Sequence, residues 1–207
     1  SITDHEFLSE VENTNLIEII PGVEMSVSWY DLELENPFAG IHLLIYFLKK
    51  DTPIYELLSK IRIEKKNRNY EILEKLKKVG VEIERKELDD LETKVPGRPH
   101  IANLMKSKGY VTSLNEAFKE YLGNGKVGDS RIHQNPIEEV IDCAKESKCL
   151  VFLAHPHTLM SNKDYSFSKN WYDSVFVDRL GSLKNLGIHG VETYYSSYSK
   201  TTSSTLS

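Results

Sequence analysis

The chain has 207 residues, 40% of them hydrophobic, which is enough to bury a sizeable core in one domain, or in one domain with a small insertion. Its formal net charge of -5 argues against a general polyanion-binding surface, including one for DNA, although a local basic pocket can still hold a phosphate. The two cysteines, Cys143 and Cys149, indicate neither a disulfide framework nor a thiolate zinc cluster. This cysteine usage favours a reducing, cytoplasmic setting. No stretch approaches the roughly 20 apolar residues that span a bilayer, so we expect no membrane partner.

The first 48 residues predict short strands and turns. Residues 17–20 are apolar apart from one glutamate, Pro21-Gly22 is typical of a turn, and residues 23–29 alternate loosely. Residues 40–48 predict the next buried strand.

Residues 51–79 change to helical spacing, and Gly80 follows as the predicted stop. The polar face of this helix is strongly basic, with interspersed glutamates. A nucleic-acid-binding ridge is one interpretation, but we favour a solvated face with helical ion pairs by about four to one. The basic residues are Arg62, Lys65, Lys66, Arg68, Lys75, Lys77 and Lys78.

The rest of the chain returns to an α/β pattern after more helix. A turn at residues 96–99 precedes helices near 100–108 and 113–122, so that residues 51–131 are a mostly helical insertion. Asn135 is the predicted cap of a helix over residues 136–147. The elements predicted after it are a strand at 150–153, a helix at 173–186 closed by Gly187, a strand at 190–195 and a disordered tail at 196–207.

Four ionisable side chains follow or occupy short apolar stretches: His5, Glu24, His42 and His155. Neutral imidazoles and carboxylates at strand ends suit a divalent metal that activates water. Any one of them alone is better explained as a hydrogen-bonded core or rim residue, by about three to one. Together they favour a metal site, because burying several ionisable groups is costly unless they are paired or bound to metal.

Six short motifs carry a resemblance to a known family. They are I-T-D-H at 2–5, I-P-G-V-E at 20–24, G-I-H at 40–42, G-R-P-H-I-A at 97–102, L-A-H-P at 153–156 and G-V-E at 190–192. On these residues the chain resembles the polymerase and histidinol phosphatase (PHP) superfamily of metal-dependent phosphoesterases. The resemblance is to the branch that acts on nucleoside 3',5'-bisphosphates and RNA 5' ends.

The resemblance implies an α/β fold, a distorted (β/α)7 barrel formed by residues 1–50 and 132–195, with the insertion at 51–131. It implies two or three divalent metals in the complete protein, manganese, iron or zinc. His5, Glu24, His42 and His155 match ligand positions, and Glu24 is the expected bridge between metals. Arg98 and His100 match phosphate-contacting positions, and a guanidinium fork does suit phosphate, while an imidazole can shuttle a proton.

Several alternatives stay open. Arg98 can instead lie in a structural turn, with phosphate contact favoured by roughly two to one. Asp4 is as well explained by strand capping as by orienting His5.

The family's opening His-x-His motif and its closing Asp-x-His pair have no counterpart here, so we expect an incomplete barrel with weak or no activity on its own. We expect the protein to hydrolyse a nucleotide or a short 5'-phosphorylated RNA through metal-activated hydroxide, with a histidinol-phosphatase-like esterase and a catalytically silent binding module as rivals.

Met25, Trp29 and the Tyr194-Tyr195 pair are interpreted as packing residues. His133 and His189 are interpreted as loop positions. His157 is interpreted as a position after the Leu-Ala-His-Pro turn, with substrate contact as an alternative because it lies close to His155 in the chain.

Overall fold

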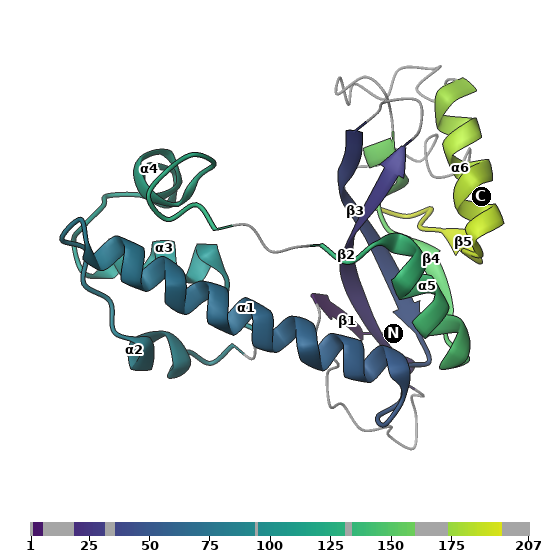
Figure 1. Ribbon diagram of the computed structural model, residues 1–207, viewed down its shortest axis with the longest axis horizontal. Coiled ribbons are helices and arrows are strands. Elements are labelled where there is room, and N and C mark those ends of the chain that lie inside the picture. Colours follow the sequence, from purple (N-terminus) through teal and green to yellow (C-terminus); the bar gives the residue numbers. More distant parts are fainter. Residues whose placement is uncertain are drawn as a thin grey trace. The chain divides into compact units, whose positions relative to one another are not determined.

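The computed structural model describes residues 2–5, 19–31, 36–93, 95–130, 134–159 and 174–195. The chain divides into two compact units (Figure 1). Unit 1 contains residues 1–57 and 134–207, and unit 2 contains residues 58–133.

Unit 1 is built on one five-stranded mixed sheet. The strand order is β1-β2-β3-β4-β5, with β1 parallel to β2, β4 parallel to β5, and antiparallel pairing of β3 with both β2 and β4. This arrangement confirms the predicted α/β class, while the (β/α)7 barrel stays a prediction. The strands are β1 (Ile2–His5), β2 (Pro21–Asp31), β3 (Asn36–Tyr46), β4 (Leu150–Leu153) and β5 (Gly190–Val191).

The first turn predicted from the sequence is wrong, because Pro21 and Gly22 lie inside β2. The carbonyl of Pro21 accepts hydrogen bonds from the backbone of Phe47 and Leu48. Proline has no N–H to donate, which is harmless at the first residue of a strand. Residues 19–20, predicted as the end of a strand, lie outside any strand.

Side chains alternate along β2 with a period of two residues, as a half-buried strand requires. Val23, Met25 and Val27 are fully buried, whereas Glu24, Ser26 and Ser28 are half-buried. Glu24 therefore belongs to the face opposite the one that carries these apolar side chains.

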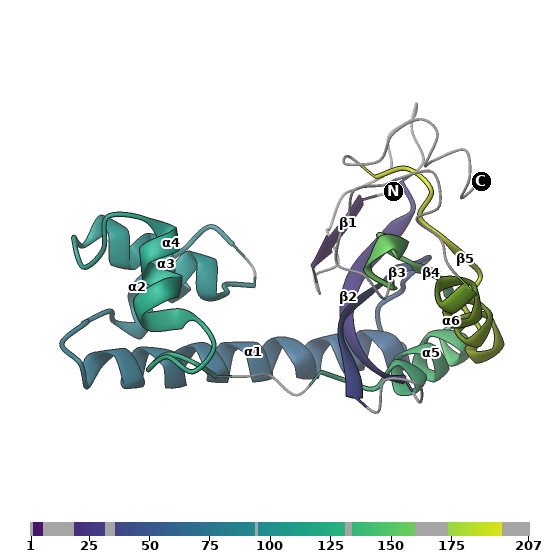
Figure 2. The ribbon, with the colours of Figure 1, turned by 90° about the horizontal axis from the view of Figure 1, so that it is seen from above.

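Two helices belong to the second half of unit 1 and lie beside the β4–β5 end of its sheet (Figures 1 and 2). Helix α5 (Ile137–Glu146) contacts β2 and β4. Its cap is Pro136 rather than the predicted Asn135, whose side-chain amide donates to Glu139 instead. Helix α6 (Ser174–Leu186) ends as predicted at Gly187, which has a φ of 114° that favours glycine.

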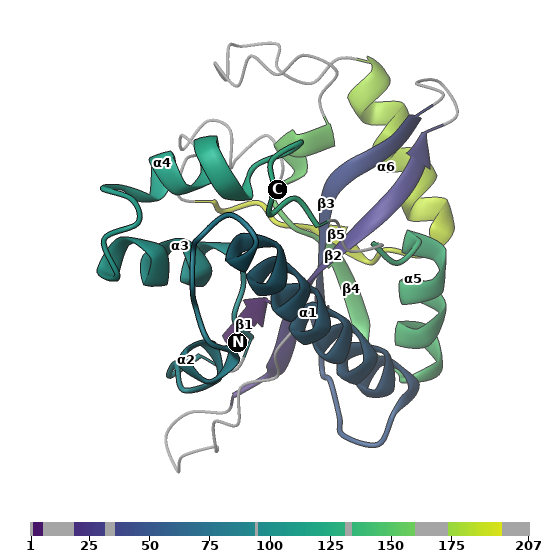
Figure 3. The same ribbon diagram turned by 60° about the vertical axis from the view of Figure 1, so that its left-hand side comes forward.

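Unit 2 is helical, as the sequence indicates (Figure 3). Its apolar core combines the second half of α1 with the helices that follow, through buried side chains such as Ile72, Leu76, Leu88 and Met105. The helices are α1 (Pro53–Lys77), which begins in unit 1, α2 (Arg85–Asp89), α3 (Arg98–Ser107), α4 (Leu114–Ala117) and a π-helical turn η1 (Phe118–Leu122).

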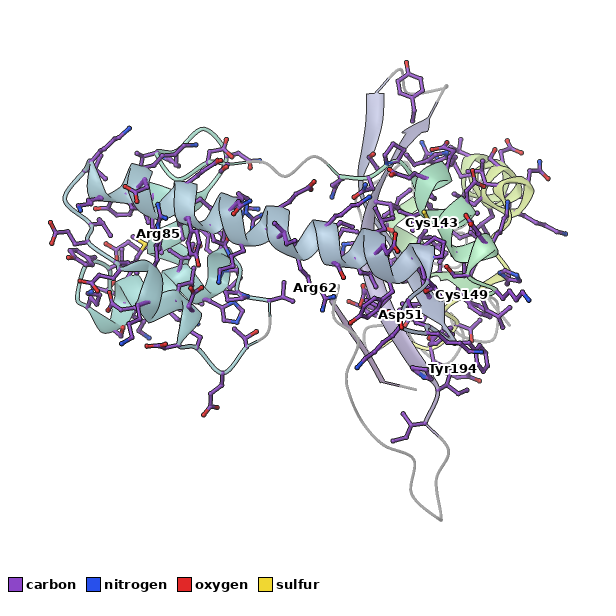
Figure 4. All side chains as sticks on the ribbon, turned by 60° about the horizontal axis from the view of Figure 1, so that its bottom comes forward. Asp51, Arg62, Arg85, Cys143, Cys149 and Tyr194 are labelled. Carbon is purple, nitrogen blue, oxygen red and sulfur yellow. The ribbon has the colours of Figure 1, made fainter. Side chains whose placement is uncertain are left out.

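The other sequence predictions concern the last strand, the two cysteines, the tail and His133. Strand β5 covers two residues rather than the six predicted over residues 190–195. Cys143 and Cys149, labelled in Figure 4, are not joined by a disulfide bond. The tail at 196–207 and His133 lie outside the described residues. In the described part of the chain, no helix combines the length and apolar character needed to cross a membrane.

Candidate metal centre

Three of the predicted ligand side chains converge in unit 1. Glu24 Oε1 lies 2.7 Å from His42 Nδ1 and 3.3 Å from His155 Nε2, and the two ring nitrogens are 3.1 Å apart. The side chains of Glu24, His42 and His155 are 19%, 24% and 16% exposed, so the group is partly shielded yet reachable from solvent.

The sheet register explains why these residues meet. Glu24 pairs with Leu44 and Ser26 pairs with His42 across the antiparallel β2–β3 ladder. Paired residues share a face, and so do residues two apart, so Glu24 and His42 are diagonal neighbours on one face. Strand β4 lies next to β3, and Ala154 just after it donates its N–H to the carbonyl of His42, which brings His155 to the same place.

The backbone at His155 adopts a conformation that side chains seldom take, with a φ of 31°. Its N–H donates to Glu192 Oε2 at 2.8 Å, and the backbone N–H of Glu192 donates to the carbonyl of Leu153. Glu192 therefore holds the strained residue in place from the segment after β5. In the sequence, Glu192 is marked only by the G-V-E motif at 190–192, and no role was predicted for it.

The donor set fits a divalent cation. Metal ligands need unprotonated lone pairs, and imidazole nitrogens with a carboxylate oxygen are the usual combination for zinc and related ions. Ligand atoms about 2.1 Å from a tetrahedral metal are roughly 3.4 Å from each other, and the 3.1 and 3.3 Å separations that involve His155 are close to this spacing. His155 Nδ1 is buried and has no hydrogen-bond partner among the described residues. The other ring nitrogen, Nε2, is the one that faces Glu24 and His42.

Strand β1 brings two further predicted residues to the same region of the sheet. Its register pairs His5 with Glu24 and Asp4 with Val23 at the level of the backbone. The side chains of β1 lie outside the described residues, so the ligand role of His5 and the orienting role of Asp4 stay predictions.

Two further aromatic side chains, Tyr195 and His157, lie beside His155. The Tyr195 ring lies 5.8 Å from that of His155 and 5.4 Å from that of His157. Burial, followed by the charge of His155, lowers the pKa of His157. Tyr195, interpreted from sequence as packing, therefore contacts the centre, whereas Tyr194 is 78% exposed (Figure 4). His189 has a structural bond, since its Nδ1 accepts from the N–H of Val151.

The two predicted phosphate-contacting residues lie in unit 2, at the start of α3. His100 Nδ1 accepts from the N–H of Gly97 at 3.1 Å, which helps to satisfy the helix start. Arg98 donates from Nη1 to the carbonyl of Leu122 at 3.3 Å. Both side chains thus have structural bonds, and phosphate contact stays a prediction.

The helical ion pairs predicted for α1 stay a prediction, but two of the residues concerned have other surroundings than a solvated face. Glu74 pairs with Arg85 of α2 at 3.0 Å, and Arg85 is labelled in Figure 4. Lys65 is largely buried, and this burial, with a smaller contribution from Arg68, lowers its pKa to about 8.

The lowered pKa of Lys65 predicts a particular pH dependence of stability. Between about pH 8 and the ordinary lysine value of 10.5, the unfolded chain binds a proton at Lys65 that the folded chain has released. The free energy of unfolding should therefore rise with pH across this window. We expect any stability advantage of Lys65→Met to be largest below pH 8 and to shrink toward pH 10.5, as measured by urea unfolding. Lys77→Met, which removes a lysine from an exposed turn of α1, is the matched control.

Comparison with known proteins finds similar curated sequences and similar solved structures. No protein-family model matches the chain. It is 25% identical over 185 residues to a 5'-3' exoribonuclease of Haemophilus influenzae, covering 86% of this chain and 63% of that protein. It is 27% identical over 188 residues to the 5'-3' exoribonuclease Rnm of Escherichia coli, covering 83% and 57%. The chain thus spans about three fifths of the length of these curated relatives.

Two solved structures share the fold. A "putative metal-dependent phosphoesterase" from Bifidobacterium adolescentis superposes with a TM-score of 0.69 at 17% identity, covering 99% of this chain and 69% of that one. An amidohydrolase from Chromobacterium violaceum, solved with sulfate and no metal, gives a TM-score of 0.61 at 21% identity, covering 89% and 60%. At these identities the likeness describes the fold alone.

Proposed function

We propose that this chain is part of a metal-dependent phosphoesterase that acts on nucleotides, either a nucleoside 3',5'-bisphosphate or the 5' end of a short RNA. The observation that carries the proposal is the convergence of Glu24, His42 and His155 within 3.3 Å of one another at neighbouring strands. The names of the two curated relatives support a ribonucleotide substrate. We also propose membership of the PHP superfamily, with residues 1–50 and 132–195 contributing to the barrel and residues 51–131 forming the helical insertion.

Each residue would have a defined task. Glu24, His42 and His155 would hold the cation, with His5 as a further ligand and Asp4 behind it. A bound divalent cation supplies a Lewis acid that lowers the pKa of water and neutralises phosphate charge. Glu192, through its bond to the His155 backbone, keeps that imidazole aimed at the other two ligands.

Phosphate recognition is assigned to the start of α3. His100 accepts a backbone hydrogen bond at Nδ1, so in the neutral ring the proton is on Nε2 and can be donated to a phosphate oxygen. Arg98 uses one of its five N–H groups on the Leu122 carbonyl and keeps others for an anion.

A turnover assay tests the proposal. The full-length gene product that contains this chain is assayed, with manganese and with EDTA, on adenosine 3',5'-bisphosphate, 5'-phosphorylated RNA and histidinol phosphate. We expect manganese-dependent release of phosphate or nucleotide from one of the first two substrates. Turnover of histidinol phosphate alone would favour the alternative esterase. A folded protein that binds no transition metal and turns over none of the three would favour a silent binding module.

A further inference from the structure

Three aromatic side chains form a compact cluster at the metal centre. The ring of His155 lies 5.9 Å from that of His157 and 5.8 Å from that of Tyr195, and the rings of His157 and Tyr195 are 5.4 Å apart. All three separations fall in the range of about 4.5–7 Å in which aromatic rings attract one another. The metal ligand His155 is one member of this cluster, and the proposed function gives the other two rings no task.

The segment that carries Tyr195 is anchored at the metal centre. Glu192 accepts a hydrogen bond from the N–H of His155 at 2.8 Å and donates its own N–H to the carbonyl of Leu153. These two bonds attach the chain to the end of β4 three residues before Tyr195. The Tyr195 ring then meets the His155 ring edge to face, at an interplanar angle of 62°. An aromatic side chain that is positioned in advance binds a ligand at a lower cost in entropy than one ordered on binding.

Tyr195 remains accessible despite these contacts. It is 37% exposed, whereas His155 and His157 are half-buried, so Tyr195 is the most accessible member of the cluster. Ligand sites typically combine aromatic side chains with a few well-placed polar or metal-binding groups. Here the exposed aromatic ring and the three metal-binding side chains are adjacent, because His155 belongs to both sets.

The position of the ring suits one part of a nucleotide. In a nucleotide only the ribose separates the base from the phosphate, so a phosphate at the metal centre leaves its base close by. The Tyr195 ring is in direct contact with a metal ligand and is therefore within reach of such a base. Every nucleobase has a π face that can stack on a tyrosine ring.

We propose that Tyr195 stacks on the nucleobase of the nucleotide whose phosphate is held at the metal centre, with His157 packed against the tyrosine ring. Stacking of this kind accepts any base, so Tyr195 would select nucleotides over other phosphate esters without selecting among the bases. The inference deepens the proposed function and rests on it in taking a nucleotide as the ligand. It assigns the recognition of the base to unit 1, in the segment after β5.

Binding of a reaction product tests the inference without turnover. Both candidate reactions can release a nucleoside 5'-monophosphate. Adenosine 5'-monophosphate and ribose 5-phosphate are therefore titrated calorimetrically into the full-length, manganese-loaded protein. The two probes share a ribose and a phosphate and differ in the base. We expect the wild type to bind adenosine 5'-monophosphate about tenfold more tightly than ribose 5-phosphate. Tyr195→Ala should reduce this ratio to less than about twofold, and Tyr195→Phe, which keeps the ring, should retain it.

The ratio separates a contact with the base from a structural effect. If Tyr195→Ala displaced His155, both probes would bind more weakly and their ratio would not change. Tyr194→Ala is the matched control, because Tyr194 is the adjacent tyrosine and is 78% exposed (Figure 4). It should alter the ratio by less than about twofold.

Three results would overturn the inference. They are equal wild-type affinity for the two probes, including no measurable binding of either, an unchanged ratio in Tyr195→Ala, and an equal loss in Tyr194→Ala. Nucleotide turnover accompanied by any of these results would leave the proposed function standing. Absence of manganese binding would instead contradict the metal centre on which the proposed function depends.

Discussion

Glu24→Gln is expected to weaken manganese or zinc binding by more than about 100-fold, because even residues that only orient metal ligands contribute about 10- to 100-fold. The amide keeps the shape of the side chain but removes the negative charge and one acceptor oxygen. The remaining pair, His42 and His155, places two ring nitrogens 3.1 Å apart without a carboxylate to balance the cation. Calorimetric titration of the metal-free protein measures the change.

The control for this substitution is Asp142→Asn in α5. Asp142 belongs to the same unit, and its side chain is 77% exposed in a long 3.9 Å pair with Lys145. Exposed pairs of this kind contribute little to stability, so metal affinity should stay within about twofold of wild type. Unchanged metal affinity in Glu24→Gln would remove the candidate metal centre from the proposal.

Leu153→Ala is expected to lower the free energy of unfolding by about 2–5 kcal/mol, because it deletes buried methyl groups and leaves a cavity. Leu153 is fully buried in β4, with β3 on one side and β5 on the other. It also precedes His155 by two residues, so the same substitution should loosen the metal centre. Urea unfolding and metal titration of one preparation measure both effects.

Leu150→Ala provides a control of the same chemistry on the same strand. Leu150 is 36% exposed at the start of β4, so the truncation leaves little cavity and should cost well under half as much as Leu153→Ala. Equal destabilisation by the two substitutions would contradict the burial pattern of β4.

The sequence predicted best the elements whose pattern is local. The apolar stripe over residues 51–79 corresponds to α1 at Pro53–Lys77, and Gly80 follows with a φ of 85°. The predicted strand at 150–153 coincides with β4. In both cases neighbouring residues alone set the periodicity.

The features that the sequence did not predict depend on distant partners. Pro21 is a strand residue because Phe47 and Leu48 donate to its carbonyl. Glu192 accepts a hydrogen bond from the backbone N–H of His155, 37 residues away in the chain, and the sequence gives no sign of this contact. Glu24, His42 and His155 were selected from sequence and do converge, but their mutual distances required the antiparallel register of β2 and β3.

The β2–β3 ladder has a consequence for assembly of the centre. Glu24 and His42 are 18 residues apart, whereas His155 lies 113 residues beyond His42, with all of unit 2 between them. The β2–β3 hairpin contains two of the three metal ligands, Glu24 and His42. Because hairpin pairing is short-range, these two ligands can come together early in folding. Arrival of the third donor would then cross-link the two halves of a discontinuous unit. A cation bridging them would close a long loop, and its removal should increase proteolysis at the crossover into unit 2.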